Sequence, residues 1–152
     1  MWFGERPDPT GALAIYRDGL KLARSVSDVY RESALHSAVV FAATELRGPE
    51  TALPCREALA RLYETRSWPF IWLSITAMST WMVAVDDLDG AAVILGYIDA
   101  HHPPLSGTDG RARALAFLRD RPEVADAIAL GAALDRDQLV LHILAHLAVS
   151  DH

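Results

Sequence analysis

The sequence predicts an all-α protein of stacked antiparallel helical hairpins, and three observations support this fold class. Ala, Leu and Arg dominate the composition, whereas the alternating β-branched runs that indicate strands are missing. Residues that start or stop helices recur at intervals of about one helix length. The chain also shows a weak internal repeat, in which the segment 41–52 matches the segment 80–91. Such a repeat is typical of a solenoid, in which each hairpin buries its apolar faces against its neighbours.

The N-terminal part is expected to contain three helices, over residues 10–25, 28–46 and 51–65. Pro9 introduces the first helix, and proline is favoured there because the N–H that it lacks would have no partner in an opening turn. The Gly-Pro pair at 48–49 ends the second helix, since proline cannot continue one. The third opens on a threonine, a residue favoured at helix starts.

The middle of the chain is expected to form two further helices. The fourth starts near Trp68, with Pro69 in its first turn, and stops at the acidic residues 86–87. The fifth covers residues 88 to about 101, and the Pro-Pro pair at 103–104 breaks it.

Three shorter helices are expected after the turn "SGTDG", over residues 108–120, 122–133 and 136–149. Asp135 and Gln138 have the spacing of a capping box, in which each side chain bonds to the other residue's backbone N–H. This pair is a specific start signal for the last helix.

The repeat indicates how the helices are organised. The offset that places 41–52 over 80–91 preserves the order of long helix, short polar joint and second helix. It aligns the second helix with the fourth and the third with the fifth. We therefore expect one helical-repeat domain over 1–152, with hairpin repeats over about 10–102 and C-terminal capping helices over about 108–150.

The composition is that of a globular protein without a nucleic-acid-binding surface. Hydrophobic residues make up 51% of the chain, charged residues make up 22%, and the net charge is −6. The Lys and Arg residues are scattered, so no basic stripe is available to neutralise phosphates. The N-terminus lacks a signal-peptide pattern, and a single cysteine, Cys55, excludes an intrachain disulfide. We expect a cytoplasmic protein that does not bind nucleic acid directly.

Residues 67–85 form an uncharged stretch that is long enough to span a bilayer. Serine, threonine and proline residues interrupt the stretch, and Arg66 and Asp86 bound it closely. A helix that is apolar on all sides is also what the centre of a stacked array requires. We therefore expect a buried helix and no membrane partner.

The acidic stretch 86–89 suggests a metal site, but its residues fit a joint between two helices better. In a calcium-loop alignment with Gly90 at the sixth position, Asp87 and Asp89 take the third and fifth positions. The first and twelfth positions then hold a valine and a glycine, so the bidentate acid is missing. The first two acids instead end one helix, and the helix dipole favours Asp89 in the first turn of the next.

No catalytic motif stands out. The chain lacks a G-x-S-x-G elbow and a G-x-x-x-x-G-K-[ST] phosphate loop, and Cys55 has apolar neighbours. His142 and His146 lie one helical turn apart and could chelate a metal. However, "HILAH" lacks the Glu of H-E-x-x-H, and no third ligand is close in sequence. We expect no enzyme activity and no cofactor, and the two histidines are weak metal candidates.

The fourth helix carries two apolar stripes, because Trp72 and Trp81 are nine positions apart and point to opposite faces. Contact with helices on both sides would explain both stripes. The alternative is a binding groove, because small polar and aromatic residues on successive first helices line the concave wall of helical-repeat superhelices. The residues predicted to line this groove, for a ligand or a partner, are Ser37, Phe41, Thr44, Trp72, Thr76 and Thr80.

Residues 85–150 resemble part of a known family. The stretch "DDLDGAAVILGYIDA" is similar to the "G-D-x-x-x-A-A-x-L-L-G-x-x-D-A" hairpin joint of bacterial ATP-dependent transcriptional regulators. These are the LuxR-type and adenylate-cyclase-like regulators with a signal-transduction NTPase core. Gly131 and Leu134 match their closing pattern "W-x-x-G-x-x-L-[ST]-x-x-[DE]-A-V", and Asp135 and Asp137 lie at its [ST] position and next to its [DE] position. The chain departs from the family at 120–121, where Leu-Gly is usual, and at the Trp of this pattern.

The resemblance implies a tetratricopeptide-like superhelical arm with a short helical cap. Such an arm is a non-catalytic protein-interaction or signal-sensing domain that restrains the other modules of a transcriptional regulator. The implied partners are a protein or other domains of the same regulator. An exposed terminal hairpin would also allow a homodimer. Two alternatives remain, which are a small-molecule or peptide receptor with its ligand in the concave groove and a metal enzyme that uses the two histidines.

Overall fold

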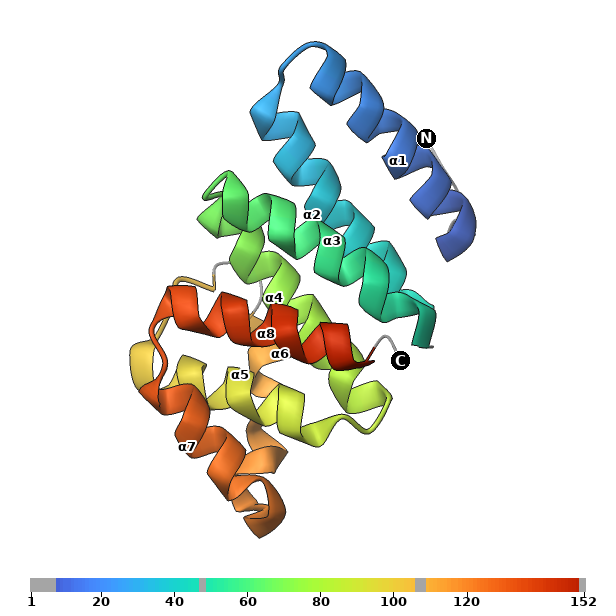
Figure 1. Cartoon of the computed structure of the whole chain (residues 1–152). Coiled ribbons are helices and arrows are strands. Elements are labelled where there is room, and N and C mark those ends of the chain that lie inside the picture. The colour runs from blue at the N-terminus through green and yellow to red at the C-terminus, as the bar shows by residue number, and fades with distance from the viewer. Residues whose placement is uncertain (1–7, 47–48, 106–108, 151–152) are drawn as a thin grey trace.

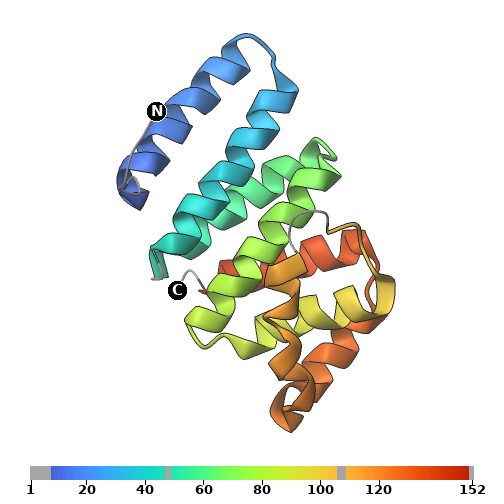
Figure 2. The ribbon, with the colours of Figure 1, turned by 180° about the vertical axis from the view of Figure 1, so that it is seen from behind.

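The computed structural model describes residues 8–46, 49–105 and 109–150, and all regular secondary structure within these ranges is helical (Figures 1 and 2). The all-α prediction is confirmed. The helices, in chain order, are α1 (Pro9–Ser25), α2 (Val29–Glu45), η1 (Pro49–Thr51), α3 (Ala52–Glu64), α4 (Trp68–Ala84), α5 (Leu88–His101), α6 (Asp109–Arg113), η2 (Ala116–Asp120), η3 (Pro122–Val124), α7 (Ala125–Ala133) and α8 (Arg136–Ser150).

Local side-chain caps explain where several helices begin. The carboxylates of Asp8, Asp28 and Asp87 accept hydrogen bonds from the backbone N–H three residues ahead, at 3.2, 3.0 and 3.2 Å. The predicted capping box at α8 is present. The Asp135 N–H donates to Gln138 Oε1 at 2.9 Å, and the Gln138 N–H donates to Asp135 Oδ1 at 2.8 Å.

Two of the predicted helices are each divided in the structure. The range 108–120 contains the short α6 followed by the 3₁₀ helix η2, and the range 122–133 contains η3 followed by α7. Arg121 separates the two ranges with an extended backbone, at φ −99° and ψ 110°. The following Pro122 explains this conformation, because the proline ring excludes the helical region for the residue before it.

Three turns between helices share one backbone geometry. Ser27, Arg66 and Asp86 each adopt a left-handed conformation, with φ of 56°, 54° and 64°. At each turn this residue and the next donate backbone N–H groups to the last turn of the preceding helix, as in a Schellman motif. Ser27 and Arg66 are equivalent under the predicted offset, so the repeat extends to the turn geometry. Each turn reverses the chain within a few residues.

The repeat offset that places 41–52 over 80–91 also places α2 over α4. Both the first and the last residues of these two helices coincide under it. The antiparallel α3 connects these helices, so α2 and α4 run parallel and pack against each other. The uncharged α4 lies in the middle of the molecule and contacts α2, α3 and α5 (Figure 1). Its residues Ile71, Met78 and Met82 are fully buried, which confirms the buried helix. Within the described ranges, no helix combines the length and apolarity needed to cross a membrane.

The C-terminal helices pack onto the array in two ways. The α5 and α7 helices approach so closely that a methyl group added at Gly96 would overlap the backbone of Ile128, and one at Gly131 would overlap that of Val93. The last helix, α8, returns to lie along α3 and also contacts α5 (Figure 1). Its Asp137 carboxylate accepts hydrogen bonds from the Tyr63 hydroxyl and the Arg66 guanidinium, both at 2.9 Å.

Candidate functional site between α2 and α4

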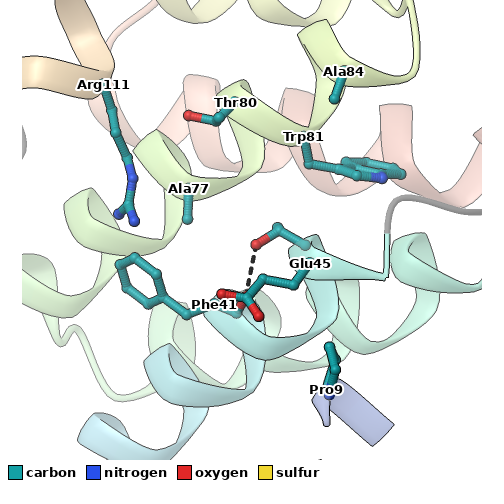
Figure 3. A pocket seen from close by; sticks show the side chains of 9 residues that line it. Pro9, Phe41, Glu45, Ala77, Thr80, Trp81, Ala84 and Arg111 are labelled. Atoms are coloured by element: carbon teal, nitrogen blue, oxygen red, sulfur yellow. Dashed lines mark hydrogen bonds between the residues drawn. The ribbon is translucent and has the colours of Figure 1, made fainter. Parts of the chain in front are cut away.

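A pocket of about 430 Å³ opens between the parallel helices α2 and α4 (Figure 3). The start of α1 and the short α6 complete its walls. Its lining residues are Pro9, Phe41, Thr44, Glu45, Ala77, Thr80, Trp81, Ala84 and Arg111. Phe41 and Thr80 are equivalent under the repeat offset, and so are Glu45 and Ala84. The repeat therefore places matching positions of two successive helices on opposite sides of one pocket.

Arg111 brings a positive charge to this pocket. Its guanidinium lies 4.3 Å from the centre of the Phe41 ring and points toward that ring from α6 (Figure 3). Within the described part of the chain, no carboxylate lies at ion-pair distance from Arg111. Partial burial lowers the pKa of Arg111, because desolvation disfavours the charged form. The pocket thus contains a half-buried cation whose N–H donors are available to a ligand.

Trp81 also lines this pocket, but its indole N–H is enclosed. Its side chain is 4% exposed, and its indole Nε1 is buried with no hydrogen-bond acceptor among the described residues. Buried N–H groups nearly always have a partner, and leaving one unpaired costs about 1–3 kcal/mol. The surrounding protein encloses this nitrogen, so Trp81 contributes to the pocket wall through its ring.

Hydroxyl and carboxylate oxygens complete the polar lining. Thr44 Oγ1 donates to the Phe41 carbonyl at 2.9 Å, and Thr80 Oγ1 donates to the Thr76 carbonyl at 3.2 Å. Both hydroxyl oxygens retain lone pairs that can accept. The Glu45 carboxylate projects into the same hollow beside Phe41 (Figure 3). The pocket therefore combines one aromatic face with donors and acceptors, which suits binding and orientation of a polar group.

Three of the six predicted groove residues line this pocket, namely Phe41, Thr44 and Thr80. The other three lie elsewhere. Ser37 and Thr76 are buried at 4% and 0% exposure, and the Thr76 hydroxyl donates to the Leu73 carbonyl.

Trp72 belongs to a line of aromatic rings on the other side of α4. Its indole lies 5.6 Å from the ring centres of Trp68 and Tyr97, and Tyr97 in turn stacks on His101 at 4.4 Å. The Arg136 guanidinium covers Trp68 at 4.2 Å from the ring centre. These contacts join α4, α5 and α8, so the side chain of Trp72 packs between helices, outside the pocket.

Sequence reasoning missed Arg111, Glu45 and Trp81 as pocket residues. Glu45 occupies the position equivalent to Ala84, one turn beyond Phe41, and this repeat equivalence is the signal that could have identified it. Arg111 reaches the pocket only because α6 folds back over α4, and no local pattern in the sequence indicates that contact.

One of the two histidine candidates, His146, forms an ion pair with Asp87. His146 Nε2 lies 2.6 Å from Asp87 Oδ2, and the His142 and His146 rings stack with centres 6.3 Å apart. In the part of the chain that the structure describes, no group of three His, Cys, Asp or Glu side chains is arranged to hold a metal ion. Asp87 therefore both caps α5 and anchors α8.

Cys55 does not offer a reactive thiol. Its side chain is fully buried, and burial raises its pKa to about 12. The thiolate, which is the nucleophilic form, is therefore rare at neutral pH.

An apolar stripe lies on the outer face of the terminal hairpin. Ile15, Leu22 and Val26 of this face are each about two-thirds exposed, at 67%, 66% and 66%. Ile15 and Leu22 lie on one side of α1, because a step of seven positions is nearly two whole helical turns, and Val26 follows directly after the helix. This stripe belongs to the terminal hairpin, which could pair two copies of the chain. The homodimer stays a prediction.

Comparison with protein-family models, with curated proteins and with solved structures finds no match for this chain. The resemblance of residues 85–150 to LuxR-type regulators therefore stays a prediction from the sequence.

Proposed function

We propose that this protein is a non-catalytic, tetratricopeptide-like binding domain that recognises a carboxylate-bearing segment of a protein partner between α2 and α4. The observation that carries the proposal is the Arg111 guanidinium, which reaches the pocket beside the Phe41 ring and has no carboxylate at ion-pair distance among the described residues. A carboxylate is the ligand group that a guanidinium fork binds best, because two parallel hydrogen bonds form at once.

The arrangement of the helices supports a repeat-type binding surface. The first helices of successive hairpins, α2 and α4, run parallel, and matching positions on them face one pocket. Extended binding surfaces of helical-repeat proteins arise in this way, from equivalent positions on neighbouring repeats. The Phe41 ring provides an apolar surface next to the charged Arg111. An apolar peptide side chain next to a bound carboxylate could pack against this ring.

The proposed place of this domain is in a transcriptional regulator, as a partner-sensing arm. The hairpin joint at 86–100 and the closing segment that includes Gly131 support this part of the proposal through their resemblance to LuxR-type regulators. Its test is the full reading frame, in which a Walker motif or a helix-turn-helix module would be expected.

The binding proposal is tested by ¹H–¹⁵N NMR of the Trp indole groups. The probe is a blocked tripeptide, acetyl-Phe-Ala-Asp, compared with the same peptide carrying a C-terminal amide and an Asn side chain. The peptide with free carboxylates should shift one indole resonance saturably, and that resonance should be absent from Trp81→Phe. Equal shifts with both peptides, or none with either, would contradict the proposal.

Arg111→Gln should weaken binding of the carboxylate peptide by roughly tenfold or more, because a charge-assisted contact is lost. The matched control is Arg121→Gln, which removes another guanidinium that lies over an aromatic ring, Phe117, at 5.3 Å and outside the pocket. The control should bind as the unaltered chain does.

The second candidate function is that of a receptor for a small carboxylate. The pocket volume of about 430 Å³ favours this candidate, since small-ligand sites span roughly 300–1,000 Å³. Succinate in the same NMR titration separates the two functions. Saturable shifts with succinate and none with the peptide would favour the small-molecule receptor.

A further inference from the structure

A second pocket, of about 290 Å³, lies between α1, α2 and α3, and basic side chains surround it. Its lining residues are Arg17, Leu20, Lys21, Arg24, His36, Val39, Pro54, Glu57, Ala58 and Arg61. We propose that this pocket binds a small tetrahedral oxyanion, of the class formed by inorganic phosphate and phosphomonoesters. The proposal concerns a different cavity from the α2–α4 pocket and does not depend on it.

Helix α1 brings three of the cations together. Arg17, Lys21 and Arg24 follow one another at intervals of four and three positions, so they lie on the same face of the helix. Within the described ranges, no carboxylate lies at ion-pair distance from Arg17 or Lys21. Neighbouring cations repel one another, and a bound anion would relieve that repulsion.

A buried carboxylate holds two of the four cations, Arg24 and Arg61. Glu32 Oε1 accepts from Arg24 Nε at 3.1 Å and from one Arg61 terminal nitrogen at 3.0 Å. Glu32 is 8% exposed, whereas the Arg24 and Arg61 side chains are 48% and 42% exposed, so the contacts are partly buried. Each guanidinium has five N–H donors and uses only some of them here, and Arg61 Nε is buried with no hydrogen-bond partner among the described residues. The two forks are therefore held in place with donors to spare.

His36 closes the inner wall of the pocket. Its Nε2 lies 3.5 Å from both Glu32 Oε1 and an Arg24 terminal nitrogen. Burial is the main cause that lowers the pKa of His36, so the ring is neutral at pH 7. It contributes a hydrogen-bonding edge without adding charge.

The charge count favours an anion. Four cations lie around the pocket, and three carboxylates oppose them. These are Glu32, Glu57 at the edge of the pocket, and the exposed Glu64, which contacts Arg61 at 2.6 Å. This local excess of positive charge belongs to a chain whose net charge is −6. An acidic molecule of this kind repels extended polyanions such as nucleic acids, so a compact anion that enters the pocket is favoured over a nucleic-acid backbone.

The pocket has room for a tetrahedral oxyanion, and the chemistry of its cations suits one. The pocket is much larger than the ~30 Å³ occupied by one water molecule, and it lies just below the range of drug-sized sites. Arginine forks match the paired oxygens of phosphate, whereas lysine acts as a mobile point charge at the rim. The pocket offers both kinds of cation on adjacent helices.

The test is isothermal titration of the full chain at pH 7 and an ionic strength of ~0.15 M, with sodium phosphate as the probe and sodium chloride as the blank. Saturable binding of one phosphate per chain, with a higher melting temperature in phosphate than in chloride, is the expected result. A parallel titration with phenyl phosphate distinguishes the two ligand sources, because tighter binding of the ester would identify a phosphomonoester. Absence of saturable binding of either probe in the millimolar range would overturn the proposal.

The double variant R17Q/K21Q removes two exposed cations of α1 that have no ion pair among the described residues. Phosphate affinity should fall by at least roughly tenfold, since hydrogen bonds to charged groups are lost. The matched control R31Q/R121Q changes the net charge equally and removes exposed arginines outside the pocket. An equal loss of affinity in the control would show general charge attraction and would overturn the site. Binding of an acidic peptide but not of phosphate would overturn it as well.

Discussion

His146 Nε2 lies 2.6 Å from Asp87 Oδ2, which joins the last helix to the turn between α4 and α5 across 59 positions of the chain. The contact shifts both pKa values. The hydrogen bond to Asp87 is the main cause that raises the pKa of His146. Burial by itself would raise the pKa of Asp87, but the hydrogen bond and charge of His146 outweigh it and the pKa is lowered. Both shifts mean that the ion pair stabilises the folded chain.

The first prediction is that this pair gives a pH-dependent stability. The His146 contribution is fully present below the ordinary histidine pKa of ~6.5 and is lost as pH rises through the raised value. The Asp87 contribution is present above the ordinary aspartate pKa of ~3.9 and is lost as pH falls through the lowered value. Urea unfolding of the unaltered chain and of His146→Gln should therefore differ most between about pH 4 and 6.5, by roughly 1 kcal/mol.

Two aspartate variants check the same contact. Asp87→Asn retains the N-cap to Gly90 but removes the charge, so it should abolish the pH-dependent difference. Asp86→Asn is the matched control, because Asp86 is exposed and asparagine tolerates its left-handed backbone. A pH profile of Asp87→Asn that equals that of the control would contradict the predicted role of the pair.

The second prediction concerns the close approach of α5 and α7. Gly96→Ala and Gly131→Ala should each destabilise the fold by roughly 3 kcal/mol, at the upper end of overpacking effects, because the added methyl group meets backbone that cannot rotate away. Thermal unfolding followed by circular dichroism measures the change. Gly110→Ala is the control, since no atom lies within 4 Å of its added methyl group. Melting temperatures of the Gly96 or Gly131 variants that match the control would disprove the close packing.

The third prediction separates packing from hydrogen bonding at Trp81. Trp81→Ala should lower the free energy of unfolding by about 3–5 kcal/mol, because it leaves a cavity in the centre of the molecule. Trp81→Phe keeps much of the ring volume and removes an N–H that has no partner among the described residues, so its effect should be much smaller. Chemical denaturation of both variants tests this order. A loss below about 1 kcal/mol for Trp81→Ala would mean that the side chain is not buried.

The fourth prediction concerns the buried carboxylate of Glu32. Its pKa is lowered because hydrogen bonds from Arg61, Arg24 and His36 together outweigh burial, which acts in the opposite direction. Glu32→Gln should reduce stability by about 1–3 kcal/mol, since two guanidinium groups lose a charged acceptor. Glu64→Gln removes an exposed carboxylate from the same Arg61 and should change stability little. Equal effects of the two variants in urea unfolding would contradict this account.

Local signals in the sequence predicted most of the helices. The capping box at Asp135 acts over three residues, so its spacing is visible in the chain itself. Asp87 was expected to end the fourth helix, but that helix ends at Ala84 and Asp87 instead caps α5. The division of the range 108–120 was not predicted, because its residues favour helix and only the three-dimensional structure shows the change to a 3₁₀ helix.

The candidate site was predictable only where the repeat controls it. Phe41 and Thr80 occupy equivalent positions of parallel helices, so the offset alone places them on one surface. Arg111 and Trp81 could not be assigned in the same way. Arg111 depends on how α6 folds back over α4, and Trp81 has as its repeat equivalent Ala42, which does not line the pocket.

The return of α8 to α3 affects how the molecule loses its structure. In an open solenoid each unit depends on its neighbours alone, so the ends can melt while the centre persists. Here the Asp137 carboxylate of α8 accepts hydrogen bonds from Tyr63 and Arg66. His146 of the same helix pairs with Asp87. The final helix therefore contacts the middle of the chain at two separate points. Detachment of α8 would expose the face of α3 that it covers, and it would also remove the ion pair at the turn before α5. The array should therefore melt in a single cooperative step, in contrast to the unit-by-unit fraying of a linear repeat protein.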